Sequence, residues 1–272
     1  MNLLTKSENI ILPVVGSLPT PNIWTWDWMG DNVSPATRQE SQSWYAGQWS
    51  GMPNTRYALC LLTAFNQSQY AKRRLAPGAV PSTINLFRNG YGSRLDFRKI
   101  DVVLDQAEMI FNVGALLGLT LLNDDKTVIY APLSTHIRVI RQFVSLFGPF
   151  VRLWVIGLEV TEYMSIEAIN TFYQIFKDAG AEIVGIHAQW DFDRMPQLPK
   201  TDVLFAELCN PYDGDNSSPA QIKQIGANVL TRCNQQGVAC VFTEYFTQLN
   251  DHAKELSRAL LELNPAGIGG PV

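Results

Sequence analysis

One pattern recurs four times along this chain and constrains its fold more than any other feature of the sequence. Each copy has apolar residues at helical spacing, then a glycine, then a short apolar run rich in branched side chains. The copies occupy residues 98–122, 134–157, 165–187 and 218–242. The periodic part predicts an amphipathic helix, and the continuous apolar run predicts a strand buried on both faces. We therefore predict four helix–strand units.

Signals at the helix ends support this prediction. Ser165 precedes the third helical segment and Ser218-Pro219 opens the fourth, as is typical of a capping serine and a proline in the first turn. Gly180 and Gly237 follow the same two segments, where glycine commonly ends a helix. The residues predicted to face inward are Ile100, Leu104, Ala107 and Phe111; Ile137, Ile140, Val144 and Phe147; Ile166, Ile169, Phe172 and Phe176; and Ile222, Ile225, Val229 and Cys233.

Four further segments, residues 22–29, 56–65, 202–208 and 266–272, are also predicted strands, which gives eight in total. Eight parallel strands alternating with helices in 272 residues predict an α/β fold, the (β/α)8 or TIM barrel. A doubly wound open sheet is the competing architecture. It is usually marked by a glycine-rich phosphate-binding loop after the first strand, and no predicted strand is followed by one. No linker divides the chain, so we predict a single domain over residues 1–272.

Three stretches depart from the regular alternation. Residues 66–97 predict a long irregular connection, and residues 189–201 lack a helical pattern, so the fifth crossover is expected to be a loop. The last predicted strand reaches the final residue, so we expect a barrel that lacks its last helix. Residues 1–20, a partner protein, or a further part of a longer chain would then cover that edge.

Composition excludes several classes of function. The chain has 21 Lys and Arg against 25 Asp and Glu, so it lacks the cationic excess that nucleic-acid binding needs. No apolar stretch reaches the roughly 18 residues of a membrane span, and the N-terminal segment is a poor secretory signal. We expect a soluble protein of unspecified location. The dispersed cysteines are predicted to be reduced: Cys60, Cys209, Cys233 and Cys240.

Polar and aromatic residues gather where the predicted strands end, which is the functional face of such a barrel. Charged residues make up only 17% of the chain, so their presence there is informative. Each one taken singly could instead cap a strand or pair with a basic residue. In chain order these residues are Asp27, Trp28, Asp31, Asn66, Asn123, Asp124, Asp125, Glu159, Glu162, Tyr163, His187, Gln189, Trp190, Asp191, Glu207, Asn210, Thr243, Glu244 and Tyr245.

Two short segments resemble the large clan of retaining glycoside hydrolases with a barrel fold. LWVIGLEV, residues 153–160, resembles the Trp-x-x-Gly-Asn-Glu ending of that clan's fourth strand, and VFTEY, residues 241–245, resembles the Glu ending of its seventh. The resemblance implies that Glu159 is the general acid/base and Glu244 the nucleophile. A retaining mechanism needs two carboxyl groups about 5–5.5 Å apart, which long side chains on opposite strands of a narrow barrel can provide.

One departure from the clan's pattern keeps a second interpretation open. Leu158 occupies the position of the clan's Asn, so the amide that would bind a sugar hydroxyl is missing there. Asn123 or Asn210 could supply it from elsewhere on the rim. Glu162 competes with Glu159 as the working carboxylate, because the pattern does not define the end of the fourth strand to the residue.

Aromatic residues on the predicted rim suit a carbohydrate ligand. Trp24, Trp26 and Trp28 alternate along the first strand, and Trp28 is nearest its end. Trp190 and Tyr245 are expected at the mouth, where aromatic faces beside amides or carboxylates would contact a pyranose ring. The tryptophans of the first strand could instead pack beneath the helices.

His187 has several interpretations: a ligand contact, a metal ligand together with Asp191 or Glu207, a group that positions a catalytic carboxylate, or a satisfied histidine at the rim. The chain has three histidines and no HxH or HExxH spacing, so neither a metal nor a cofactor is predicted. Trp154 lies within a strand and is predicted to be core, and Lys200 is predicted to be solvated.

The favoured function is a retaining glycoside hydrolase that cleaves an O-glycosidic bond by double displacement. The alternative, motivated by Leu158, is a glycosidase-like barrel with weak or no activity that binds carbohydrate or serves as a structural module of a cell-surface or virion assembly. The predicted catalytic residues are Glu159 and Glu244. The predicted carbohydrate contacts are Asp27, Trp28, Asn123, Glu162, His187, Trp190, Asn210 and Tyr245.

Overall fold

The computed structural model describes the chain in separate ranges. They are residues 22–26, 55–61, 87–89, 91–95, 116–122, 130–149, 151, 153–157, 159–188, 197–208, 218–244, 256 and 259–269. For residues 22–26, 55–61, 116–122, 244 and 267–269 it describes the backbone only.

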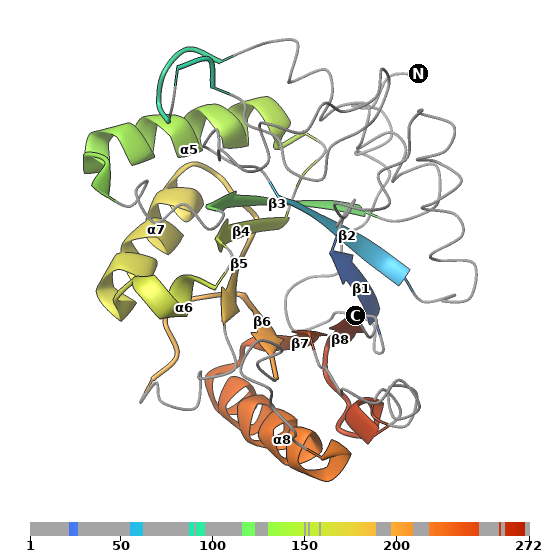
Figure 1. Cartoon of the computed structure of the whole chain (residues 1–272). Helices are drawn as coiled ribbons and strands as arrows, with labels where there is room; N and C mark the ends of the chain where they lie inside the picture. Colours follow the sequence, from blue (N-terminus) through green and yellow to red (C-terminus); the bar gives the residue numbers. More distant parts are fainter. Residues whose placement is uncertain are drawn as a thin grey trace.

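Eight parallel strands form a closed barrel in which each strand pairs with its neighbours in sequence and β8 pairs with β1 (Figure 1). The strands are β1 (Asn22–Trp26), β2 (Thr55–Leu61), β3 (Leu116–Leu122), β4 (Leu153–Gly157), β5 (Ile183–Ala188), β6 (Val203–Glu207), β7 (Ala239–Glu244) and β8 (Gly267–Gly269). All eight lie within or overlap the predicted segments. The prediction of a (β/α)8 barrel is therefore confirmed.

Four helices are described: α5 (Leu133–Phe147), α6 (Val160–Tyr163), α7 (Ile166–Asp178) and α8 (Pro219–Gln236). They lie outside the ring of strands, with α5 and α7 on one side and α8 on another (Figure 1). The predicted caps are confirmed. Ser165 Oγ accepts the Ala168 N–H at 3.2 Å, and Ser218 forms a reciprocal capping box with Gln221. Gly237 ends α8 in the left-handed conformation that glycine adopts without steric cost. The predicted helix over residues 98–113 lies outside the described residues.

The inward faces of the helices are wider than predicted. Of the predicted inward residues, Ile137 and Ile225 are partly buried and pack against the core, and Ile166 is half-buried. On α5 the buried face also includes His136, because its ring lies 4.7 Å from that of Phe172. The sequence pattern missed four further buried residues: Val139, Phe143, Ile175 and Gly226. A helix that packs against both a strand and neighbouring segments buries more than one narrow stripe.

A short antiparallel bridge, Phe87 with Leu95, lies in the predicted irregular connection and packs on α5. The Phe87 ring stacks on Phe143 at 5.6 Å, and the Tyr91 hydroxyl shares a hydrogen bond with His136 Nδ1 at 2.8 Å. Burial raises the pKa of Tyr91. This contact explains how a histidine is accommodated on the inward face of α5. In the predicted loop after β5, residues 197–201 are described and contain no helix.

Side chains alternate along the described strands between two apolar regions. Leu204 and Ala206 of β6 belong to the cluster that includes the helices, whereas Val203 and Phe205 are buried outside that cluster and face the barrel interior. A Cβ on Gly185 would lie 2.7 Å from Phe205 Cε2, so glycine gives the ring room inside the barrel. Trp154 is 1% exposed, which confirms it as core. The described interior-facing side chains of β5 and β6 are thus closely packed.

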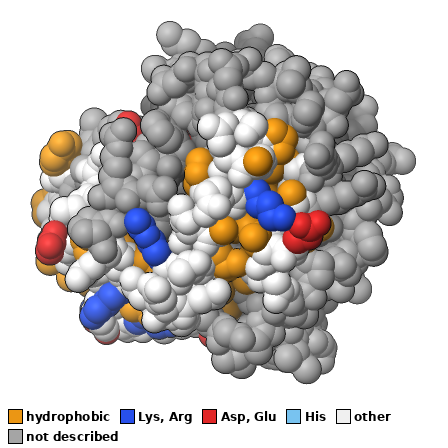
Figure 2. Space-filling view, turned by 90° about the horizontal axis from the view of Figure 1, so that it is seen from below, with side chains coloured by type: hydrophobic (Ala, Val, Ile, Leu, Met, Phe, Trp, Pro, Cys, Tyr) orange, Lys and Arg blue, Asp and Glu red, His pale blue; other side chains and the backbone are white. Residues whose placement is uncertain are grey.

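Lys200 and the two described thiols agree with the sequence analysis. Lys and Arg side chains on the face in Figure 2 are separated by apolar and uncharged atoms rather than gathered into one basic patch. Lys200 is exposed, and Cys233 and Cys240 are buried free thiols. None of the described helices is long and apolar enough to cross a membrane. The expectation that another segment or a partner covers the edge beside β8 stays a prediction, since residues 1–21 and 270–272 lie outside the described residues.

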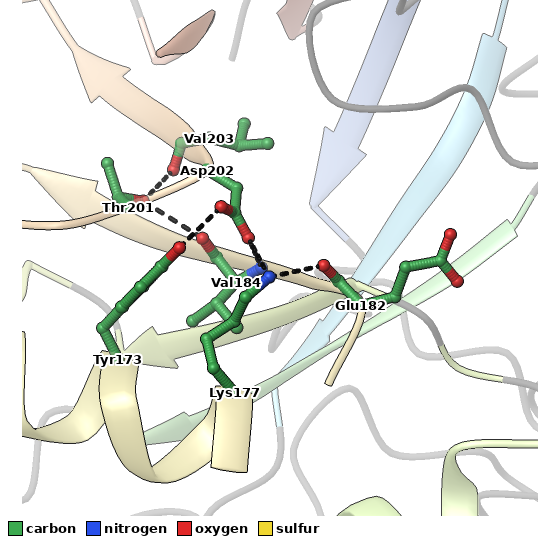
Figure 3. A network of polar contacts seen from close by, with 7 residues as sticks. All are labelled: Tyr173, Lys177, Glu182, Val184, Thr201, Asp202 and Val203. Atoms are coloured by element: carbon green, nitrogen blue, oxygen red, sulfur yellow. Dashed lines mark hydrogen bonds and ion pairs between the residues drawn. The ribbon is translucent and has the colours of Figure 1, made fainter. Parts of the chain in front are cut away.

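A polar network joins α7 to the amino-terminal ends of β5 and β6 (Figure 3). Asp202 accepts hydrogen bonds from Tyr173 Oη at 2.8 Å, from the Val184 N–H at 2.8 Å and from Lys177 Nζ at 3.0 Å. Burial and the hydrogen bond to Asp202 raise the pKa of Tyr173 to about 12. This end of a barrel usually contributes stability rather than chemistry.

Replacing Asp202 with alanine is therefore expected to lower the free energy of unfolding by about 2–3 kcal/mol, because a buried amide and a tyrosine hydroxyl lose their acceptor. Urea denaturation measures this. Asp178→Ala is the matched control, because Asp178 is exposed and bonds only Gln174 among the contacts described, so about 0.5 kcal/mol or less is expected. Equal effects in the two variants would contradict this role of Asp202.

Candidate active site

The carboxyl ends of β4, β5, β6 and β7 bring four polar residues to one rim of the barrel. Glu159 follows β4, His187 is the second-last residue of β5, Glu207 ends β6 and Glu244 ends β7. Because all strands are parallel, these ends open onto the same face. The described part of the rim thus includes three glutamates and one histidine from consecutive strands.

Glu159 adopts an unusual backbone conformation. Its φ of 49° and ψ of 34° lie in the left-handed region, and it is the residue that begins α6. Its carbonyl accepts the Glu162 N–H at 3.0 Å, and its side chain is half-buried. This conformation costs a non-glycine residue about 1–2 kcal/mol. Such strain persists only where surrounding contacts over-determine it, and it concentrates at functional sites.

His187 supplies one such contact. Its Nδ1 lies 3.1 Å from the backbone nitrogen of Glu159. An amide N–H can only donate, so Nδ1 is the acceptor and the proton of the neutral ring is on Nε2. The ring is 0% exposed, and this burial lowers the pKa of His187 to about 3. A typical hydrogen bond contributes about 0.5–1.5 kcal/mol, which is comparable with the strain at Glu159.

Two of the strands align Glu244 with Glu207. The register between β6 and β7 pairs Ala206 with Phe242 and then Glu207 with Glu244, so β7 contains one extra residue, Thr243. This is a β-bulge, and bulges often lie beside active sites, where they redirect the chain. The Thr243 hydroxyl donates to the Ala206 carbonyl at 3.3 Å across it. Without the bulge, residue 243 rather than Glu244 would lie opposite Glu207.

Glu207 is one of the residues that the sequence analysis placed on the rim but did not include among the predicted catalytic residues and carbohydrate contacts. It continues the interior-facing row of Val203 and Phe205, and it is only 5% exposed. The signal was present, since a lone carboxylate ended a continuous apolar run. Only the register of β6 and β7 shows that Glu207 lies beside Glu244 on the neighbouring strand.

The two candidates for the acid/base differ in exposure. Glu159 is half-buried at the strand end, whereas Glu162 is exposed on α6. The other predicted contacts, Asp27, Trp28, Asn123, Trp190, Asn210 and Tyr245, lie outside the described residues, as does Leu158. Their roles, and those of the catalytic pair, stay predictions.

The predicted contact between His187 and a ligand is also untested, but the described contact of its ring is with the Glu159 backbone. Within the described ranges, no group of three or more His, Cys, Asp and Glu residues is arranged to hold a metal ion.

His187 is expected to make folding stability depend on pH. The unfolded ring titrates near pH 6.5, whereas the folded ring titrates near 3, so the unfolded chain binds more protons between these values. The stability is fully present above about pH 6.5 and is lost as the pH falls toward 3. Between pH 7.5 and 5 the loss is about 2 kcal/mol.

Urea unfolding of the wild type and His187→Asn at the two pH values measures this contribution. From pH 7.5 to 5, the free energy of unfolding of the variant should fall by about 2 kcal/mol less than that of the wild type. Equal losses would show that His187 is not responsible.

Known structures share this fold. No protein-family model and no curated protein matches the sequence. A glycoside hydrolase family 5 enzyme from Prevotella bryantii B14 aligns with a TM-score of 0.64 at 9% identity, over 96% of this chain and 91% of that one. A family 5 lichenase from Caldicellulosiruptor sp. F32 aligns with a TM-score of 0.64 at 10% identity, over 96% and 86%.

A mutant of the Prevotella enzyme, in complex with a xyloglucan tetradecasaccharide, aligns with a TM-score of 0.62 at 10% identity, over 97% of this chain and 92% of that one. At these identities the likeness concerns the fold. The resemblance to barrel glycoside hydrolases, first drawn from two short segments of sequence, is confirmed at that level.

Proposed function

We propose that this glycoside-hydrolase-like barrel is a retaining glycoside hydrolase with Glu159 as the acid/base and Glu244 as the nucleophile. One observation carries the proposal: Glu159 follows β4 and Glu244 ends β7 on the same rim, each at a backbone irregularity. Glu159 is left-handed, and Glu244 follows the bulge at Thr243. Chains rarely keep such irregularities by accident at the functional face of a barrel.

The reaction follows from the two roles. The Glu244 carboxylate attacks the anomeric carbon while the Glu159 carboxylic acid gives its proton to the glycosidic oxygen, so the bond to the leaving group breaks and the alcohol departs. Glu159, now ionised, takes a proton from water, which attacks the same carbon. The ester to Glu244 breaks, and the sugar leaves with its original configuration. Both glutamates return to their starting protonation states.

A β-linked glucan is the substrate class that we propose. The structurally similar enzymes are described as a lichenase and as a family 5 enzyme whose mutant is in complex with a xyloglucan oligosaccharide. An O-glycoside is neutral, and a net charge of −4 does not repel it. Trp28, Trp190 and Tyr245 would provide the aromatic faces on which sugar rings stack.

Leu158 favours a second function, carbohydrate binding without turnover. An asparagine at this position would bind a sugar hydroxyl, and contacts of that kind strengthen in the transition state. A barrel without this asparagine could still bind carbohydrate and yet fail to hydrolyse it.

Hydrolysis assays with xyloglucan, mixed-linkage β-glucan and soluble cellulose separate the two functions. The proposal expects release of reducing sugar, with the β-anomer formed first in the proton NMR spectrum. Initial formation of the α-anomer would indicate inversion and exclude the double displacement. Binding by calorimetry without any product would favour the binding module.

A further inference from the structure

We propose that His187 is a positioning residue: its Nδ1 holds the Glu159 amide and thereby fixes the direction in which the acid/base carboxyl leaves the backbone. The inference deepens the proposed function and rests on it for its catalytic consequence. The contact itself is independent of that function, because it joins described atoms of two neighbouring strands.

The contact replaces a bond that the sheet cannot make. β4 ends at Gly157, and β4 pairs with β5 from Leu153 opposite Ile183 to Val155 opposite Gly185. Beyond the strand end, the Glu159 N–H needs a new acceptor, since buried amides are nearly always paired. The His187 ring provides it from the next strand. An aliphatic side chain in this place would leave the amide without that acceptor.

The position of the ring is well defined. His187 follows Ile183 and Gly185 in the interior-facing row of β5, while Val184, Ile186 and Ala188 belong to the cluster with the helices. Its Cα is in register with that of Phe205, a buried residue of β6. Packing therefore restricts the ring, and a restricted acceptor fixes the amide more firmly than a mobile one would.

The direction of the Glu159 side chain depends on its backbone, because a residue with positive φ projects its Cβ differently from one with negative φ. If the amide were released, Glu159 would relax toward an ordinary conformation and its carboxyl would move away from the glycosidic oxygen. Misplacement by about 1 Å can reduce the rate of a catalysed step about 100-fold. His187 would then act on proton transfer through Glu159, with no contact to the substrate of its own.

Three substitutions test the inference. His187→Asn keeps an acceptor close to the position of Nδ1. His187→Gln carries its amide further out, near the position of Nε2, and His187→Leu has no acceptor. The substrates are phenyl β-cellobioside, whose leaving group needs protonation, and 2,4-dinitrophenyl β-cellobioside, whose leaving group does not.

We expect His187→Leu and His187→Gln to reduce kcat/KM for the phenyl glycoside about 100-fold, because kcat/KM reports the first step, in which the leaving group is protonated. For the activated glycoside kcat/KM should change only a few-fold, and His187→Asn should restore most of kcat/KM for the phenyl glycoside. Equal losses on both substrates would mean that His187 has a general structural role and would overturn the inference. If Leu fails to fold, the comparison of Asn with Gln gives the same decision.

A second measurement does not depend on turnover. Amide hydrogen exchange at Glu159, followed by NMR on the full chain, should accelerate at least about tenfold in His187→Leu or His187→Gln and stay slow in His187→Asn. Unchanged exchange in both Leu and Gln would overturn the inference even if the enzyme is active. A wild type with slow exchange but no turnover would instead refute the proposed hydrolase and leave the contact established.

Discussion

Glu244→Gln is expected to reduce hydrolysis of the best glucan substrate at least about a thousandfold, because a side-chain amide cannot form the glycosyl ester that a carboxylate forms. The two side chains have nearly the same size and shape. The backbone of β7 pairs with β6 and β8 on either side, and these pairings do not involve the substituted atoms. The fold should therefore be retained while the chemistry is lost. Initial rates with wild type and variant at equal concentration measure the effect.

Glu167→Gln is the matched control. Glu167 is an exposed residue in the first turn of α7, on the outer layer of the barrel, so the same chemical change should leave the rate within about twofold. Circular dichroism and the thermal midpoint of Glu244→Gln should match those of the wild type. Turnover by a folded Glu244→Gln protein above about a tenth of the wild-type rate would remove Glu244 from the nucleophile role.

Glu159→Ala should slow glycosides with poor leaving groups by about 100- to 10,000-fold, which is the usual contribution of general acid catalysis. For activated aryl glycosides the rate of the first step should fall much less, because their leaving groups depart without a proton. Azide should then accelerate the variant and yield a β-glycosyl azide, since a charged nucleophile needs no general base. Steady-state rates across a series of aryl β-cellobiosides measure the dependence.

Glu162→Ala decides between the two carboxylates that the sequence left in competition. Glu162 is exposed on α6, three residues beyond Glu159, and we expect its loss to change rates only a few-fold on every substrate. If Glu162→Ala shows the strong dependence on the leaving group and azide rescue, and Glu159→Ala does not, the acid/base is Glu162.

The fold could be predicted from the sequence because its signals are local and repeated. Ser165, Ser218 and Gly237 act within one turn of the helix that they cap, so their residue types alone indicate where α7 and α8 begin and α8 ends. The apolar runs of β4 to β7 are buried in every described position except Ala239, as a parallel sheet covered by helices requires. The predictions of burial failed at positions where burial depends on a contact with a residue far away in the sequence. His136 is buried on α5, where its ring contacts Phe172 and shares a hydrogen bond with Tyr91, 45 residues earlier.

The site was predictable only in part. A carboxylate after an apolar run indicates the rim, which is how Glu159, Glu207 and Glu244 could be placed there. Residue order does not show which of them face one another. The bulge at Thr243 shifts Glu244 by one position relative to β6, and nothing in the residues 239–244 marks the shift.

Periodicity and capping chemistry are properties of neighbouring residues, so the sequence alone specified the eight strands, their order and the rim to which the three glutamates belong. The left-handed backbone of Glu159, its bond to His187 and the pairing of Glu207 with Glu244 were decided only in the closed barrel. Each of these depends on atoms 28 or more residues apart in sequence or on the register of two strands. Such contacts exist only when packing holds both partners in place, and that is why the chemistry of this rim depends on the tertiary structure.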